Sequence, residues 1–242
     1  MAILQKGLFP EAKEQAKGIL FEEIATNRLM IGCKELDERF LLGLFGGYWP
    51  FVSGFPQVIE KSYADLGRFA QGEREQRLFS KIGRLLAGSK ELSAVARDEA
   101  EHKGLWLLSA KQASYLKGDL ENYQVPPSAF RLTKDIEERI DFIDVLLDFA
   151  SVEFVAEGIS RTLMDSPEFR GLMGEKGKRW FEEHFVATHD GTPHEDISLA
   201  FARDMAPIIR GQDLTSEEVA KKCIASGRRF IVCANDIVAN LH

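Results

Sequence analysis

The sequence predicts an all-α protein, a single-domain bundle of seven or eight helices that spans residues 1–242. Apolar residues recur at helical spacing along almost the whole chain, while strand-like alternation never persists for more than a few residues. A chain of 242 residues is long enough to bury one large core. No repeat, low-complexity tract or long linker divides it, so we expect a single domain.

Helix signals follow one another through the first half of the chain. Pro10 opens a first predicted helix, which continues to about Arg28. Residues 37–66 are apolar and contain several helix breakers, which predicts two or three short helices there: Gly46, Gly47, Pro50, Gly54 and Pro56. Residues 72–88 and 89–118 predict two further helices, or one long helix broken near Gly88.

The second half continues in the same way. Pro126 and Pro127 indicate a loop within residues 120–133, and a long helix is predicted from Thr133 to Met164. Another helix lies within residues 170–190, and the chain breaks at Gly191. Two capping boxes then begin the last two helices, one from Thr192 to Glu195 and one from Thr215 to Glu218.

Composition excludes several function classes. Lys and Arg number 31 against 38 Asp and Glu, and the net charge of −7 gives no electrostatic support for a nucleic-acid partner. The apolar runs are shorter than the roughly 20 residues of a membrane span, so we expect no membrane partner. The first residues also lack the apolar core of a secretory signal, and we expect a cytoplasmic protein.

The three cysteines form no disulfide framework and show no CxxC spacing. Cys223 and Cys233 lie on the apolar stripe of the last predicted helix, so we interpret them as packing residues. Cys33 lies near a helix break and is the only candidate for a reactive thiol.

Polar residues occupy predicted core positions in the stretch "RDEAEHKGLW", residues 97–106. Five residues follow helical steps of 3, 4, 3 and 4 and form one inward stripe: Leu92, Val95, Glu99, His102 and Trp106. Glu101 and Lys103 point elsewhere. A carboxylate and an imidazole therefore occupy two successive core positions.

Polar residues also occupy predicted core positions in other helices. Glu157 continues an apolar stripe that includes Leu147 and Phe154, and Glu153 shares part of that face. Four of the five histidines lie on or beside predicted core faces: His102, His184, His189 and His194.

Buried carboxylates are costly unless they are compensated, and one or two divalent metal ions would compensate carboxylates and imidazoles together. Glu and His at positions i and i+3 project toward one point, as in helical di-iron proteins. A set without thiolates favours iron or manganese over structural zinc. The alternative is structural: Glu99 pairs with an arginine, and the histidines are hydrogen-bonded packing residues. The candidate arginines are Arg28, Arg68 and Arg97.

Three motifs resemble the heme-oxygenase-like superfamily, which includes TenA, PqqC and the CADD-like proteins. They are "DEAEHKGLW", "VEFVAEGIS" and "RWFEEHFVATHDGTPHED", and "GYWPFVSGFPQVI" also looks like the early helix pair of that family. The resemblance is closest to the CADD-like, di-iron oxidase branch. It implies a heme-oxygenase-like helical fold and the metal ligands Glu99, His102, Glu157, His184, Asp190 and His194.

The last motif departs from that branch. The family spaces its final ligands as HxxxDxxH on one helix, whereas Asp190 follows His184 by six residues and His194 follows it by ten. Either a loop carries Asp190 and His194 into place, or His189 substitutes for one of them.

The resemblance implies a metal-dependent oxidoreductase with two irons, or manganese, and O₂ as co-substrate. Its substrate would be a small organic molecule, apolar or amino-acid-like, and the protein would be a homodimer. We expect Tyr48, Trp106 and Phe154 to line the substrate pocket, although core packing explains these aromatic residues equally well.

Two other function classes stay open. One is a non-catalytic helical interaction protein, and the other is a metal-independent hydrolase of the TenA type, which needs a nucleophilic cysteine. Heme oxygenase needs a histidine on its first helix, but no histidine precedes His102. The PqqC type needs a basic pocket, and this chain offers acids.

Overall fold

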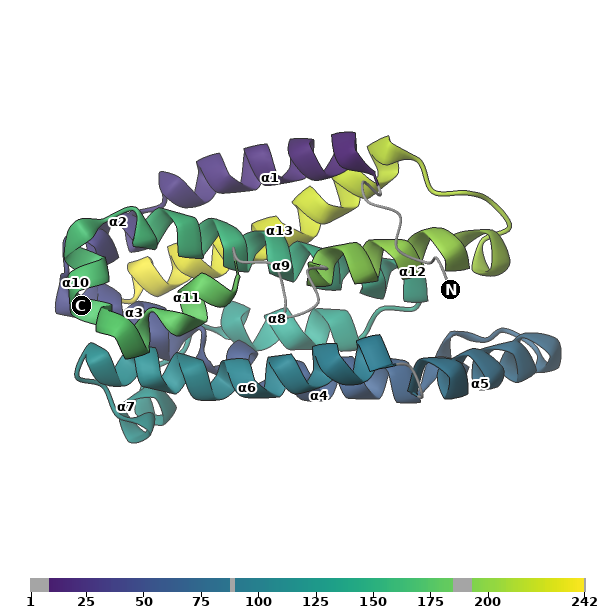
Figure 1. Cartoon of the computed structure of the whole chain (residues 1–242), viewed down its shortest axis with the longest axis horizontal. Helices are drawn as coiled ribbons and strands as arrows, with labels where there is room; N and C mark the ends of the chain where they lie inside the picture. The colour runs from purple at the N-terminus through teal and green to yellow at the C-terminus, as the bar shows by residue number, and fades with distance from the viewer. Residues whose placement is uncertain (1–8, 88–89, 185–192, 242) are drawn as a thin grey trace.

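The computed structural model describes residues 9–87, 90–184 and 193–241, and within these ranges every regular element is a helix (Figure 1). The predicted all-α class is therefore confirmed. The described ranges contain thirteen α-helices and one short 3₁₀ helix, more than the seven or eight that we predicted. The difference arises because short helices form within segments that we expected to be loops or parts of longer helices.

The helices follow one another in this order: α1 Pro10–Ala25, α2 Arg28–Lys34, α3 Glu38–Gly47, α4 Trp49–Ala64, the 3₁₀ helix Leu66–Phe69, α5 Glu73–Ala87, α6 Lys90–Gln112, α7 Lys117–Asn122, α8 Pro127–Glu137, α9 Phe142–Met164, α10 Pro167–Gly177, α11 Arg179–Glu183, α12 His194–Ile209 and α13 Ser216–Ala239.

Helix α9 is the central helix of the fold. It packs against α1, α12 and α13, and it crosses the middle of Figure 1 between α1 and α6. A helix enclosed on all sides is apolar all round, and α9 buries residues on every face. Its buried Asp148 lies 2.8 Å from Arg139 Nε and 2.8 Å from an Arg229 nitrogen, so its charge is compensated. Polar side chains of α9 are therefore held in the interior.

The region before α9 differs from the prediction. We expected one helix from Thr133 to Met164, but α8 ends at Glu137 and α9 begins at Phe142. Asp141 is the N-cap of α9, and its Oδ1 accepts a hydrogen bond from Ile143 N at 2.8 Å. Such a cap satisfies an amide that a helix start leaves without a partner, which favours a new helix start over a continuous helix.

Other local predictions agree with the structure. Pro10 opens α1, and Thr215 caps α13 by accepting a hydrogen bond from Glu218 N at 3.1 Å. Helices α3 and α4 meet beside Gly47, where an added Cβ would collide with Ile237 of α13. Glycine is therefore needed there for close helix packing. The predicted cap Thr192 lies outside the described residues.

All three cysteines are buried, which confirms the packing interpretation of Cys223 and Cys233. Cys33 is also fully buried, and burial raises its thiol pKa well above the ordinary value. The structure thus gives no support to Cys33 as a reactive thiol. Among the described residues, none of the helices combines the length and the apolarity that a bilayer crossing demands.

Candidate metal centre

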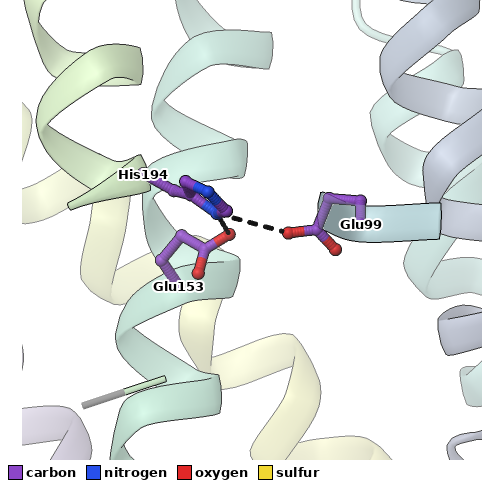
Figure 2. A group of neighbouring side chains, drawn as sticks. All are labelled: Glu99, Glu153 and His194. Carbon is purple, nitrogen blue, oxygen red and sulfur yellow. Dashed lines mark ion pairs between the residues drawn. The ribbon is translucent and has the colours of Figure 1, made fainter. Parts of the chain in front are cut away.

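Three helices bring two carboxylates and one imidazole together in the interior. Glu99 comes from α6, Glu153 from α9, and His194 is the first residue of α12. One oxygen or nitrogen atom from each residue lies within 4.8 Å of the others. His194 Nδ1 is 3.6 Å from Glu99 Oε1 and 3.7 Å from Glu153 Oε1, as the dashed lines in Figure 2 show. These three possible metal-ligand atoms therefore lie close enough together to bind one ion.

The inward stripe of α6 agrees with its predicted helical phase. Glu99 and His102 are each 7 % exposed, and Trp106 is 1 % exposed. Glu101, which the same pattern places outside the stripe, is exposed. The sequence periodicity therefore identified which acid of this stretch points inward.

A second imidazole, that of His102, contacts Glu99, and a third, that of His184, packs against His102. His102 Nδ1 is 3.3 Å from Glu99 Oε2, and the rings of His102 and His184 are 4.7 Å apart between centroids. The ring of His194 lies 6.2 Å from that of His102. One Glu99 oxygen thus faces His194 and the other faces His102, so this carboxylate lies between two groups of imidazoles.

Hydrogen bonds on the outer side orient two of these rings. His194 Nε2 contacts Asp98 Oδ2 at 3.4 Å, which leaves Nδ1 directed at Glu99 and Glu153. His184 Nδ1 lies 2.7 Å from the carbonyl oxygen of Trp180, which can only accept a hydrogen bond. In both rings one nitrogen is held by an acceptor, as is usual for histidines that bind metals through the other nitrogen. The helical periodicity could not identify Asp98 as a site residue, because Asp98 lies off the apolar stripe.

The electrostatics of the metal-free cluster follow from burial and proximity. Burial opposes a charge on His194, but its contacts with Glu153 and Glu99 outweigh burial and raise its pKa to about 11. Burial and, to a lesser extent, the neighbouring His102 lower the pKa of His184 to about 3, so His184 is neutral. Burial and the Glu99 charge raise the pKa of Glu153. His102 and His194 lower the pKa of Glu99 despite its burial. A metal ion would have to displace the proton of His194.

Two buried atoms of the cluster make no hydrogen bond within the described part of the chain: Glu99 Oε1 and His102 Nδ1. Both atoms have ion-pair contacts, Glu99 Oε1 with His194 at 3.6 Å and His102 Nδ1 with Glu99 Oε2 at 3.3 Å, but buried polar atoms without a hydrogen bond are rare. Both are good ligand atoms for a divalent cation, and the histidines beside them are already oriented. The residues present therefore fit a metal ion of the class that binds carboxylate and imidazole.

Glu157 does not belong to this cluster, although we predicted it as a ligand. Its Oε2 lies 2.6 Å from Lys17 Nζ and its Oε1 lies 2.7 Å from Arg161 Nε. Both carboxylate oxygens thus have cationic partners. Glu153, one helical turn earlier, faces His194 instead. The arrangement therefore supports Glu153 in place of Glu157.

The other predicted ligands are placed as follows. Glu99 and His194 lie together, His102 contacts Glu99, and His184 packs against His102. Asp190 and its alternative His189 lie outside the described residues.

The predicted pocket residues take part in packing. Trp106 Nε1 donates a hydrogen bond to the Phe45 carbonyl oxygen at 3.1 Å, and the Tyr48 hydroxyl donates one to the Phe230 carbonyl oxygen at 2.8 Å. Phe154 is fully buried. The structure therefore shows core packing for these three residues, and a role in binding substrate stays a prediction.

The fold resembles solved structures of TenA homologues. The one from Pseudomonas syringae pv. tomato matches with a TM-score of 0.64 and 13% identity, over 96% of this chain and 93% of that chain. The TenA homologue from P. horikoshii has a TM-score of 0.49 and 10% identity, with coverage of 95% and 98%. By sequence, the chain matches no known family model and no curated protein. The first likeness shows that the chain has a TenA-like all-α fold, while membership of the CADD-like branch stays a prediction.

Proposed function

We propose that this protein is a non-haem iron oxidase or oxygenase that uses O₂ to oxidise a small organic substrate. The observation that carries the proposal is the orientation of His194. Its Nδ1 faces two interior glutamates while its Nε2 contacts Asp98. This arrangement of imidazole, ligand carboxylates and outer carboxylate is typical of metal sites in helical proteins.

The donor set favours iron, with manganese as the alternative. Imidazoles and carboxylates hold iron in oxygenases, whereas structural zinc sites commonly use thiolates. The three cysteines are buried, and none belongs to the cluster of possible ligands that the described residues form. When bound, iron would supply the electrons for reduction of O₂.

Glu99 supports a centre of two metal ions. Its Oε1 faces His194 and its Oε2 faces His102, which lies beside His184. We propose that Glu99, Glu153 and His194 hold the first ion, and that Glu99, His102 and His184 contribute to the second. Asp190 or His189 would complete the second position.

The surrounding residues orient the ligands and exclude water. Asp98 holds the ring of His194, and the carbonyl of Trp180 holds the ring of His184. The Trp180 ring packs against His184 at 4.2 Å and against Trp106 at 4.6 Å between centroids. These aromatic rings form an apolar wall beside the imidazoles, which would limit access of water and favour an apolar or amino-acid-like substrate.

An anaerobic titration of metal-free protein with Fe²⁺, followed by exposure to O₂, tests this proposal. We expect about two ferrous ions per chain and a visible absorbance change after O₂ is added. Binding of only one Fe²⁺ ion per chain would contradict the second metal position and keep the first. No bound iron would refute the proposal and leave the helical interaction protein or the TenA-type hydrolase.

The predictions of a single domain and a homodimer belong to the same proposal. One cooperative unfolding transition and a mass of twice the chain in solution are the expected results.

A further inference from the structure

Lys17 of α1 is held between two acidic side chains close to the candidate metal centre. Its Nζ lies 2.6 Å from Glu157 Oε2 and 2.9 Å from Glu195 Oε1. The three side chains are 19 %, 12 % and 10 % exposed, so these ion pairs are largely shielded from water. The same ammonium group lies 5.3 Å from the ring centre of Phe154. Lys17 is therefore fixed by two carboxylates and one aromatic face.

Both partners of Lys17 are near neighbours of metal-site residues. Glu157 follows Glu153 by one turn of α9, and Glu195 follows His194 directly at the start of α12. Helix α1 packs along α9, as Figure 1 shows. Lys17 thus connects α1 to the two helices that carry Glu153 and His194.

A largely buried pair of carboxylates needs positive charge between them. Lys17 supplies it here, and Arg161 and Lys13 add contacts at the outer side, at 2.7 Å from Glu157 and 3.6 Å from Glu195. Two carboxylate oxygens within 3 Å of one cation are also what a divalent metal ion would use. The ammonium group and a metal ion would therefore compete for the same oxygens.

We propose that Lys17 is a positioning residue that acts as a built-in cation: it occupies Glu157 and Glu195 and so keeps both carboxylates out of metal binding. The inference rests on the proposed metal centre, because it explains why Glu153 faces His194 while Glu157 does not. Burial disfavours the charge of Lys17, but Glu195 and Glu157 outweigh burial and raise its pKa. The ammonium form is thus maintained.

The test is the number of Mn²⁺ ions bound per chain, measured by equilibrium dialysis and by the loss of the free Mn²⁺ EPR signal. Lys17→Met removes the charge and approximately keeps the volume. We expect K17M to bind one more Mn²⁺ per chain than the unchanged protein, because Glu157 and Glu195 become available. The double variant K17M/E157Q should lose this additional ion and keep the original number.

Lys13→Met is the matched control. Lys13 lies one turn earlier on α1; its closest contact is Asp196 Oδ1 at 2.6 Å, and its contact with Glu195, at 3.6 Å, is longer than the 2.9 Å contact of Lys17. We expect K13M to bind the same number of ions as the unchanged protein. A merely structural role of Lys17 would lower metal binding in K17M and could not add an ion.

Equal numbers and affinities in K17M and the unchanged protein would overturn the inference while leaving the proposed function standing. No Mn²⁺ bound to the unchanged protein would refute the proposed centre, and the inference, which rests on that centre, would fall with it. If K17M loses helicity, Lys17→Gln serves instead, because its uncharged amide removes the cation that competes for the carboxylates while a polar group remains at this partly exposed position. A gain of one ion in K17Q supports the inference, and no gain overturns it.

Discussion

The two ring nitrogens of His194 face carboxylates on consecutive residues of α6: Nδ1 lies 3.6 Å from Glu99, and Nε2 lies 3.4 Å from Asp98. The side chains of neighbouring helical residues point in different directions, so the ring of His194, at the start of α12, lies between two diverging acids of α6. One acid is then available to a metal ion and the other fixes the ring.

Replacing Asp98 by asparagine should weaken metal binding without unfolding the protein. The amide keeps the size of the side chain but loses the negative charge that supports the Nε2 proton of His194. Loss of such an outer partner typically lowers metal affinity by about 10- to 100-fold. Isothermal titration with Mn²⁺ measures the change, and Glu101→Gln, an exposed acid of the same helix, is the control. Equal affinities in both variants would show that Asp98 does not support the site.

Replacing His102 by alanine should lower the bound iron from about two ions per chain to one, because the second position is lost, while helicity is largely kept. His102 lies 3.3 Å from Glu99 and has a buried nitrogen without a hydrogen bond within the described part of the chain. Iron content after anaerobic loading and far-ultraviolet circular dichroism measure the two effects. Glu101→Ala should change neither. Unchanged iron in the His102 variant would exclude His102 as a ligand.

The cysteines should stay unreactive in the folded protein from pH 7 to pH 9. Burial raises the pKa values of Cys223 and Cys233 to about 12, and that of Cys33 is also raised well above the ordinary value. At pH 8 a thiol with a pKa of about 12 is ionised to only about 1 part in 10⁴. A coloured thiol reagent should therefore react with all three cysteines in urea and with none in the native chain.

The same shifts predict the direction of a pH effect on stability. The unfolded thiols ionise near pH 9, whereas the folded ones keep their protons up to about pH 12. The contribution of these buried thiols to the free energy of unfolding is therefore complete below pH 9. It is lost as the pH rises from 9 to about 12. For the reactivity of the thiols, rapid labelling of one cysteine in the native chain at pH 8 would contradict the prediction that all three stay unreactive. It would favour the TenA-type hydrolase.

Replacing Trp106 by alanine should lower the free energy of unfolding by about 3–5 kcal/mol, as is usual for deletion of a buried large aromatic side chain. Trp106 is 1 % exposed and packs against Phe45 and Trp180. Urea unfolding measures the loss. Leu108→Ala, at an exposed position of the same helix, should cost less than about 1 kcal/mol. A small cost for Trp106→Ala would favour a pocket-lining role over a packing role.

Helical periodicity was sufficient to predict the fold class and the inward face of α6. It placed Glu99, His102 and Trp106 inside and Glu101 outside, as the structure has them. These predictions succeeded because burial along one helix depends on local spacing.

The choice between Glu153 and Glu157 could not be predicted in this way. Residues at i and i+4 share one face of a helix, so both acids pass the same test. Their roles are separated by Lys17, which is distant in sequence and reaches Glu157 from α1. Asp98 was missed for a similar reason, because its partner His194 lies on another helix.

The most direct test of the account compares Mn²⁺ affinity in the unchanged protein, Glu153→Gln and Glu157→Gln. The two variants make the same chemical change one turn apart on α9. The account predicts that E153Q weakens Mn²⁺ binding by more than about 100-fold, a larger loss than that expected for the outer partner Asp98. It predicts that E157Q changes the affinity by less than about twofold. Loss of binding in E157Q with normal binding in E153Q would contradict the proposed centre.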